Sequence, residues 1–285
     1  FKNIMNEYYA KDISKKRRIV NKMKGNAGVP LSPPPYGYIK NTDDPRFWVV
    51  EPEAAEVVRR IYCMALEGYG LAEIAARLVA DMIQIAGADR YITMDLHAGQ
   101  IQGFFSIPGD VLSGYHIIKP YLLDMLPSMN NPVMVTADLG FAKRGRRYAE
   151  ALNIPLAFIE KRRHGNRDKS EALTIIVDIS HHDVILIDDE VDTGGSMAEA
   201  AMLAKDNGAE NIYMVFVHPI LSTNAVERLA ALPVKQFITT NTIPIPPEKQ
   251  ALFGGRLTIL TIGPLIGEVI RRANEGRSVG AMFNE

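Results

Sequence analysis

The chain has 285 residues, of which 47% are hydrophobic and 23% are charged, a composition typical of a globular protein with one or two domains. It contains neither an apolar run long enough to cross a bilayer nor a signal peptide, so we expect no membrane insertion and no secretion. The single cysteine, Cys63, cannot form an internal disulfide, which favours a cytoplasmic location.

The net charge of -1 conceals an uneven distribution. Residues 1–40 contain nine lysines and arginines against two acids, whereas the remainder contains 23 basic and 31 acidic residues. A basic head on an acidic body predicts two parts with different partners. Because Phe1 is not an initiator methionine and the first residues already have a helical pattern, we expect the natural N-terminus to lie upstream.

The first part of the chain is expected to be small, basic and mainly helical. A helix over residues 1–24 is followed by GNAGVPLSPPPYGY (residues 25–38), which predicts an extended linker because proline and glycine break helices. A short strand is expected at residues 47–50 and a helix from Pro52, with acids in its first turn. The glycines of residues 68–70 end that helix, and another begins near Leu71.

The rest of the chain alternates short β-branched runs with amphipathic segments. Strands are expected at residues 91–94, 133–136, 156–159, 184–188, 212–217 and 236–239, and helices at residues 143–152, 197–207 and 224–231. This alternation predicts an α/β fold with a parallel sheet flanked by helices. Ligands of such sheets bind at the carboxyl ends of the strands.

The segment VILIDDEVDTGGS (residues 184–196) predicts a phosphate site at one of those strand ends. An apolar strand ends in Asp188 and Asp189, whose carboxylates can accept hydrogen bonds from sugar hydroxyls. The glycines that follow allow backbone N–H groups to approach a phosphate at a helix N-terminus, and hydroxyl donors flank them. The proposed loop consists of Asp192, Thr193, Gly194, Gly195 and Ser196. The alternative is a plain strand–turn–helix connection with an aspartate cap.

This loop resembles the PRPP-binding signature that phosphoribosyltransferases share with ribose-phosphate diphosphokinases, the PRPP synthetases. Residues 79–285 resemble a PRPP synthetase in several further segments, among them AGADRYITMDLHAGQIQGFF, VMVTADLGFAKRGRRYAEAL, PLAFIEKRRHGN and VHPILSTNAVERL. The resemblance implies a phosphoribosyltransferase-like fold. It also implies transfer of diphosphate from Mg-ATP to ribose 5-phosphate, giving PRPP and AMP, in the cytoplasm and by a homo-oligomer.

The resemblance also assigns further site residues. His97, in MDLHAGQ, and Asp138, in TADLG, would be Mg²⁺ ligands, while Lys161 and Arg163 would stabilise the transferring group as catalytic residues beside His97. Imidazole is an unusual ligand for Mg²⁺, and the family usually has Ser-Pro-Asp and a second glycine where this chain has Thr-Ala-Asp and Phe141. Without the resemblance, a structural histidine is the simpler interpretation of His97, and an Asx turn is the simpler interpretation of Asp138. The basic segment that contains Lys161 and Arg163 would then be solvated surface.

Residues 1–78 resemble part of a large serine recombinase: the end of the long helix leaving the catalytic domain and the start of the DNA-binding domain. The resemblance implies weak DNA contact through residues 1–40, although a solvated charged helix explains the charge equally well. The nucleophilic serine of that family would lie upstream, so DNA cleavage is not expected. The join of two families near Leu78 predicts a truncated or chimaeric reading frame.

Residues 79–285 would lack most of the first subdomain of a PRPP synthetase, including its Arg-Gln-Asp motif, which this chain does not contain. We therefore expect the ribose-phosphate half-site to be intact and the use of ATP to be impaired. A phosphoribosyltransferase, a DNA-binding recombinase fragment and a non-catalytic regulatory homologue remain as alternatives.

Overall fold

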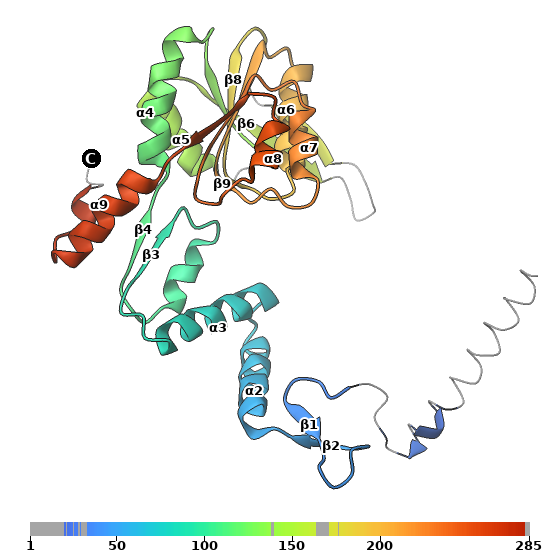
Figure 1. The fold of residues 1–285 in the computed structure, drawn as a ribbon. Coiled ribbons are helices and arrows are strands. Elements are labelled where there is room, and N and C mark those ends of the chain that lie inside the picture. Colours follow the sequence, from blue (N-terminus) through green and yellow to red (C-terminus); the bar gives the residue numbers. More distant parts are fainter. Residues whose placement is uncertain are drawn as a thin grey trace, which may run out of the picture. The chain divides into compact units, whose positions relative to one another are not determined.

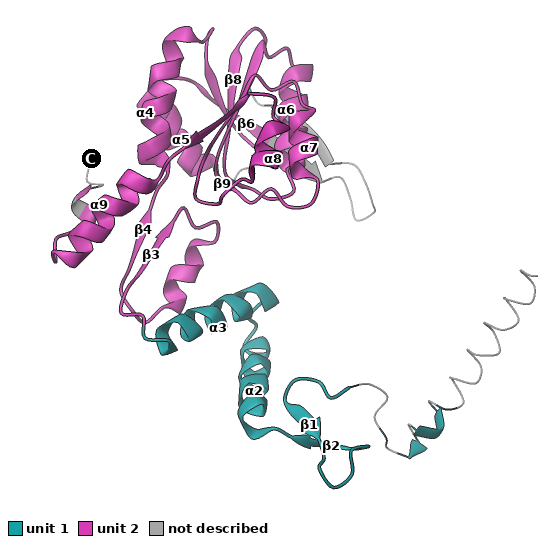
Figure 2. Ribbon diagram, viewed as in Figure 1, with its two compact units in different colours: residues 1–87 teal, residues 88–285 magenta. Residues whose placement is uncertain are grey.

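The computed structural model describes residues 20, 22–24, 26–27, 29, 33–137, 140–163, 171–175 and 177–282, without the side chains of residues 160–163, 171–174 and 281. The chain divides into two compact units, residues 1–87 and residues 88–285 (Figure 2). The expected change of family at residues 78 and 79 stays a prediction. That position lies inside one continuous helix, and the units divide nine residues later.

Between residues 33 and 87, the first unit has a small hairpin and two helices. Strands β1 (Tyr38–Lys40) and β2 (Trp48–Val50) pair antiparallel. Helix α2 (Pro52–Leu66) begins at a proline, and Gly68, with φ of +95°, lies just beyond its end, as expected for these residue types. Helix α3 is Leu71–Ile85. Most of the helix expected over residues 1–24 lies outside the described residues.

A seven-stranded sheet forms the centre of the second unit, in the order β11-β10-β9-β8-β5-β6-β7 (Figure 1). Its members are β5 (Val133–Thr136), β6 (Leu156–Arg163), β7 (Glu171–Ile175), β8 (Asp183–Val191), β9 (Asn211–Pro219), β10 (Gln236–Thr240) and β11 (Leu257–Leu260). All neighbouring strands are parallel except β7, which is antiparallel to β6. The expected α/β fold with a parallel sheet is confirmed.

Two separate hydrophobic cores lie on the opposite faces of this sheet. One contains α6 (Gly195–Asp206) and α7 (Ala225–Ala230), and the other contains α4 (Tyr115–Met125), α5 (Ala142–Leu152) and α9 (Gly263–Asn274). The central strand β8 supplies both cores because its side chains alternate. Val184 and Leu186 face one core, while Ile185 and Ile187 face the other, all at most 1% exposed. The short α8 (Pro247–Ala251) completes the described α-helices of this unit.

The strand expected at residues 91–94 forms, but not in the large sheet. Strand β3 (Tyr91–Met94) pairs in parallel with β4 (Gly109–Leu112) in a separate two-stranded sheet. A 3₁₀ helix, Gly99–Phe104, connects the two strands. Further short 3₁₀ turns occur at Leu126–Ser128 and Gly280–Met282. Among the described helices, none is long and apolar enough to cross a membrane.

Candidate active site

The predicted residues at the end of β8 line one cleft of about 180 Å³. Asp188, Asp189 and Glu190 lie in the last part of the strand, and residues 192–196 connect it to α6. The buried apolar residues of β8 hold this end in place, because its neighbours β5 and β9 pair with it in register. His97 enters the cleft from the segment after β3.

The loop before α6 has a backbone shape that depends on glycine. Gly194 has φ of +72°, in the left-handed region where a side chain is strained. No side chain caps the N-terminus of α6. The first-turn N–H groups of a helix have no partner within the helix, and here the residues that carry them, from Gly195 to Met197, line the cleft. Thr193 and Ser196 are exposed beside them.

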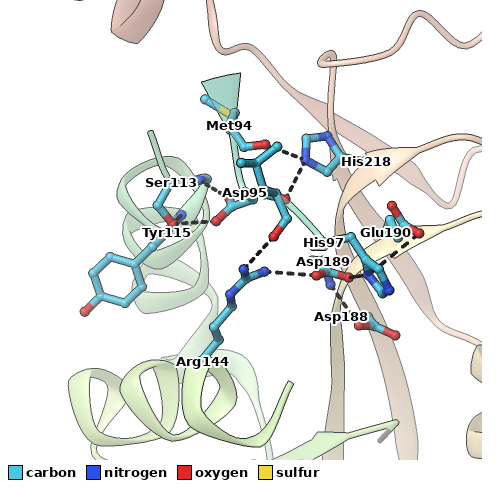
Figure 3. A network of polar contacts seen from close by, with 12 residues as sticks. Met94, Asp95, His97, Ser113, Tyr115, Arg144, Asp188, Asp189, Glu190 and His218 are labelled. Carbon is cyan, nitrogen blue, oxygen red and sulfur yellow. Dashed lines mark hydrogen bonds and ion pairs between the residues drawn. The ribbon is translucent and has the colours of Figure 1, made fainter. Parts of the chain in front are cut away.

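Asp189 is the centre of a polar network (Figure 3). Its side chain is only 8% exposed. His97 donates from Nδ1 to Oδ1 of Asp189 at 3.2 Å, and Arg144 donates from Nη1 to Oδ2 at 2.9 Å. Because carboxylates are buried only when paired, these two hydrogen bonds explain how Asp189 can lie inside the molecule. The backbone N–H of Asp189 donates to the Asp188 carboxylate at 2.9 Å.

His97 is more exposed than its partner, with 65% of its side chain accessible. The hydrogen bond to Asp189 raises the pKa of the His97 imidazole above its ordinary value of 6.5, against partial burial. The Glu190 carboxylate lies 3.7 Å from Nδ1 and acts in the same direction, as does Asp188. The sequence predictions did not include Glu190.

Arg144, on α5, was also not predicted. It donates from Nη2 to the backbone carbonyl of Leu96 at 2.8 Å while it bonds Asp189, so it ties the segment that carries His97 to the end of β8. The only signal in the sequence was its place shortly after the end of a predicted strand. Its two partners are 45 and 48 residues away along the chain, which sequence spacing alone does not reveal.

His218, on β9, fixes the end of β3 in a similar way. Its Nε2 donates to the Met94 carbonyl at 3.1 Å (Figure 3). Its Nδ1 lies 3.0 Å from the hydroxyl of Thr242. Asp95 turns inward instead of facing the cleft: it has φ of +38° and accepts hydrogen bonds from the Ser113 hydroxyl and the Gly114 N–H. Asp95 therefore has a structural role.

Three predicted site residues cannot be compared with the structure. Asp138 lies outside the described residues, and the side chains of Lys161 and Arg163 do as well, although their backbone belongs to β6. Their roles stay predictions. A larger, open groove of about 690 Å³ lies between the end of α5 and the start of β6, but its lining includes none of the predicted site residues.

Comparison with known proteins identifies relatives for most of the chain. Residues 163–284 match the family described as phosphoribosyl synthetase-associated domain. A ribose-phosphate pyrophosphokinase of Caldanaerobacter subterraneus subsp. tengcongensis is 43% identical over 210 residues, covering 74% of this chain and 65% of the relative. The enzyme of that name from Clostridium acetobutylicum is 41% identical over 212 residues, with the same two shares.

Among solved structures, phosphoribosylpyrophosphate synthetase from Mycobacterium smegmatis superposes with a TM-score of 0.65 at 36% identity, covering 73% of this chain and 66% of that chain. About three quarters of the chain is thus related to ribose-phosphate pyrophosphokinases and has their α/β fold. The chain spans just under two thirds of the length of these curated relatives.

Proposed function

We propose that residues 79–285 form the ribose-phosphate-binding part of a ribose-phosphate pyrophosphokinase, which makes PRPP and AMP from ATP and ribose 5-phosphate. One observation carries the proposal. A pair of aspartates at the end of β8 is followed by an uncapped helix N-terminus, and His97 and Arg144 both bond the second of them, Asp189, from two other elements. A phosphoribosyltransferase would share the loop and the fold but not the DLHAGQ and EKRR segments, and the relatives do not favour it.

In this proposal, Asp192, Thr193, Gly194, Gly195 and Ser196 bind the 5-phosphate. The backbone N–H groups of the first turn of α6 and the two hydroxyls donate to the phosphate oxygens. Asp188 and Asp189 accept hydrogen bonds from the ribose hydroxyls. The positive φ of Gly194 supports this role because it shapes the loop around the helix N-terminus.

In this proposal, Mg²⁺ would enter the site with ATP. Among the described residues, no three metal-ligating side chains are grouped to hold an ion. Mg²⁺ is usually bound through one or two protein ligands together with substrate phosphates and water. His97 and Asp138 would supply those ligands, and the carboxylates beside His97 suit a hard cation. When bound, the metal neutralises charge on the phosphates.

The proposed reaction joins the C1 hydroxyl oxygen of ribose 5-phosphate to the β-phosphorus of ATP. The bond between that phosphorus and the oxygen bridging to the α-phosphorus breaks, AMP leaves, and the hydroxyl proton is released. Negative charge shifts onto the bridging oxygen during this step. Lys161 and Arg163 would stabilise that charge as catalytic residues, since cations placed at developing charge lower the barrier.

An assay for AMP released from ATP with Mg²⁺, with and without ribose 5-phosphate, tests this function. It should include the present chain and a version whose first domain is completed from a relative. We expect the completed version to release AMP only when ribose 5-phosphate is present. The proposal is wrong if the completed version releases none.

Several further properties stay proposals. A homo-oligomer and a cytoplasmic location agree with the relatives' enzyme class. Weak DNA contact through residues 1–40 and the recombinase origin of residues 1–78 rest on sequence resemblance alone. A gel-shift titration with duplex DNA would test the contact, which should disappear on deletion of residues 1–40 and weaken steeply with salt.

A further inference from the structure

The segment before and within α7 forms a support beneath the phosphate loop. The N–H groups of Leu221 and Ser222 donate to the carbonyls of Val191 and Asp192 at 2.9 and 3.0 Å. A Cβ placed on Gly194 would lie 3.3 Å from the side chain of Leu229. The segment therefore contacts the chain at Val191, Asp192 and Gly194.

Arg228, on the exposed side of α7, makes a fourth contact. Its Nη1 donates to the Thr193 carbonyl at 2.6 Å, and its Nη2 lies within 3.4 Å of the Asn224 side-chain oxygen. A Cβ placed on Gly195 would lie 3.8 Å from Nη1. The guanidinium is therefore directly beside the N-terminus of α6, where the phosphate would bind.

The lining of the cleft is acidic, and the guanidinium of Arg228 would offset that negative charge where the phosphate binds. Four carboxylates line it, those of Asp188, Asp189, Glu190 and Asp192, and its described lining includes no lysine or arginine. A phosphate dianion would be repelled by these groups. Arg144 bonds Asp189 at the sugar end, whereas Arg228 lies at the phosphate end.

We propose that Arg228 is a positioning residue for phosphate recognition. It holds the Thr193 carbonyl, and with it the loop, and its charge offsets the acidic lining so that ribose 5-phosphate is preferred over uncharged ribose. This inference rests on the proposed function. Arg228 was not among the residues that the sequence assigned to the site, because Thr193 is 35 positions away along the chain.

The test is calorimetric titration of the full chain with ribose 5-phosphate at several salt concentrations. Arg228→Gln should weaken binding about tenfold, the effect of losing one charge-assisted hydrogen bond. Binding by the variant should also fall less steeply with salt than binding by the wild type, because a charge contribution is lost. Arg228→Lys keeps the charge, so it should restore the salt dependence and part of the affinity.

Lys249→Gln is the matched control. Lys249 also donates from a cationic side chain to a backbone carbonyl of this support, that of Leu221, but it does not contact the loop. It should bind ribose 5-phosphate like the wild type. Equal binding and equal salt dependence in Arg228→Gln and wild type would overturn the inference, and so would weaker binding with an unchanged salt dependence or an equal loss in Lys249→Gln. Absence of binding by the wild type would instead overturn the proposed function itself.

Discussion

At Gly194, a change in backbone conformation should directly affect the proposed binding of ribose 5-phosphate. Its φ of +72° and the nearby Leu229 side chain both oppose a Cβ. Gly194→Ala should therefore strain the loop by about 1–2 kcal/mol and weaken ribose 5-phosphate binding at least tenfold. Calorimetry measures the affinity, and thermal unfolding measures the strain.

Gly254→Ala is the control that separates backbone strain from loss of ribose 5-phosphate affinity. Gly254 has a similar φ of +60°, nothing lies within 4 Å of its added Cβ, and it is remote from the loop in sequence. It should lower the melting temperature through the same backbone strain while leaving ribose 5-phosphate affinity unchanged. Equal affinities of Gly194→Ala and wild type would show that the loop does not hold the phosphate.

Tyr148 lies inside the core beside α4, and its phenol should make the free energy of unfolding depend on pH. Burial raises the pKa of its phenol well above 10.0, and the charge of Asp95 adds to the effect. The folded state keeps this proton where the unfolded state loses it, so stability present below about pH 10 is lost as the pH rises further. Tyr148→Phe has no proton to lose. Its free energy of unfolding, measured in urea, should fall less between about pH 9 and 11.

Tyr62→Phe serves as the comparison for Tyr148, since its ring is 67% exposed on α2. It should follow the wild-type curve across the same pH range. Parallel curves for wild type and Tyr148→Phe would mean that the phenol is not buried as described.

The loop residues that the sequence assigned to the cleft have their partners close along the chain, whereas His97, whose partner Asp189 is 92 residues away, was assigned through the family resemblance alone. Residues 188–196 form one local strand–loop–helix unit, so their composition alone indicates a phosphate site. Arg144, His218 and Arg228 could not be predicted, because each meets a partner 35 or more residues away. Their contacts exist only after the sheet has formed.

At the scale of elements, Arg144 joins α5, the segment after β3 and the end of β8. Removing either partner of its bond to Asp189 should lower stability, and the two effects should not add because the residues share one interaction. We expect a coupling energy of about 1 kcal/mol in a double-mutant cycle of Arg144→Gln and Asp189→Asn, measured by urea unfolding.

Glu268 and Arg271 on α9 provide a contrasting pair. They lie 2.8 Å apart on one exposed helix and join no separate elements. Their coupling should be at most about 0.5 kcal/mol. A coupling at Arg144 and Asp189 no larger than this would contradict a tie between the three elements.

Most elements of the sheet follow from the sequence because buried parallel strands are continuous apolar runs. The runs at residues 133–136 and 236–239 appear almost as predicted. Strand β7 was missed because it is antiparallel to β6 and lies at the edge of the sheet. Helix α4 was missed as well, since Pro120 lies inside it and a proline normally indicates a helix boundary. Nor could the pairing of β3 with β4 be predicted, because a strand pattern does not specify its sheet.

At the scale of the whole molecule, the chain combines the cleft at the end of β8, where we propose that ribose 5-phosphate binds, with a two-stranded sheet, β3–β4, that has no neighbouring strands among the described residues. Its relatives are longer, with the matched region covering 65% of their length. An intact ribose-phosphate half-site with impaired use of ATP was expected from family motifs and stays a prediction, since periodicity alone gives no information on how much of a domain is present. The proposed function therefore treats binding of ribose 5-phosphate and turnover of ATP as separately testable properties.

The most direct measurement is ³¹P NMR of the completed version with Mg²⁺, ATP and ribose 5-phosphate. We predict PRPP and AMP in equal amounts, because the bond at the β-phosphorus breaks and the diphosphate moves as a unit. Asp189→Asn in the same background should reduce both signals together. Formation of ADP with a ribose bisphosphate, in which only one phosphoryl group has moved, would contradict the central claim, and so would the absence of any product from ribose 5-phosphate.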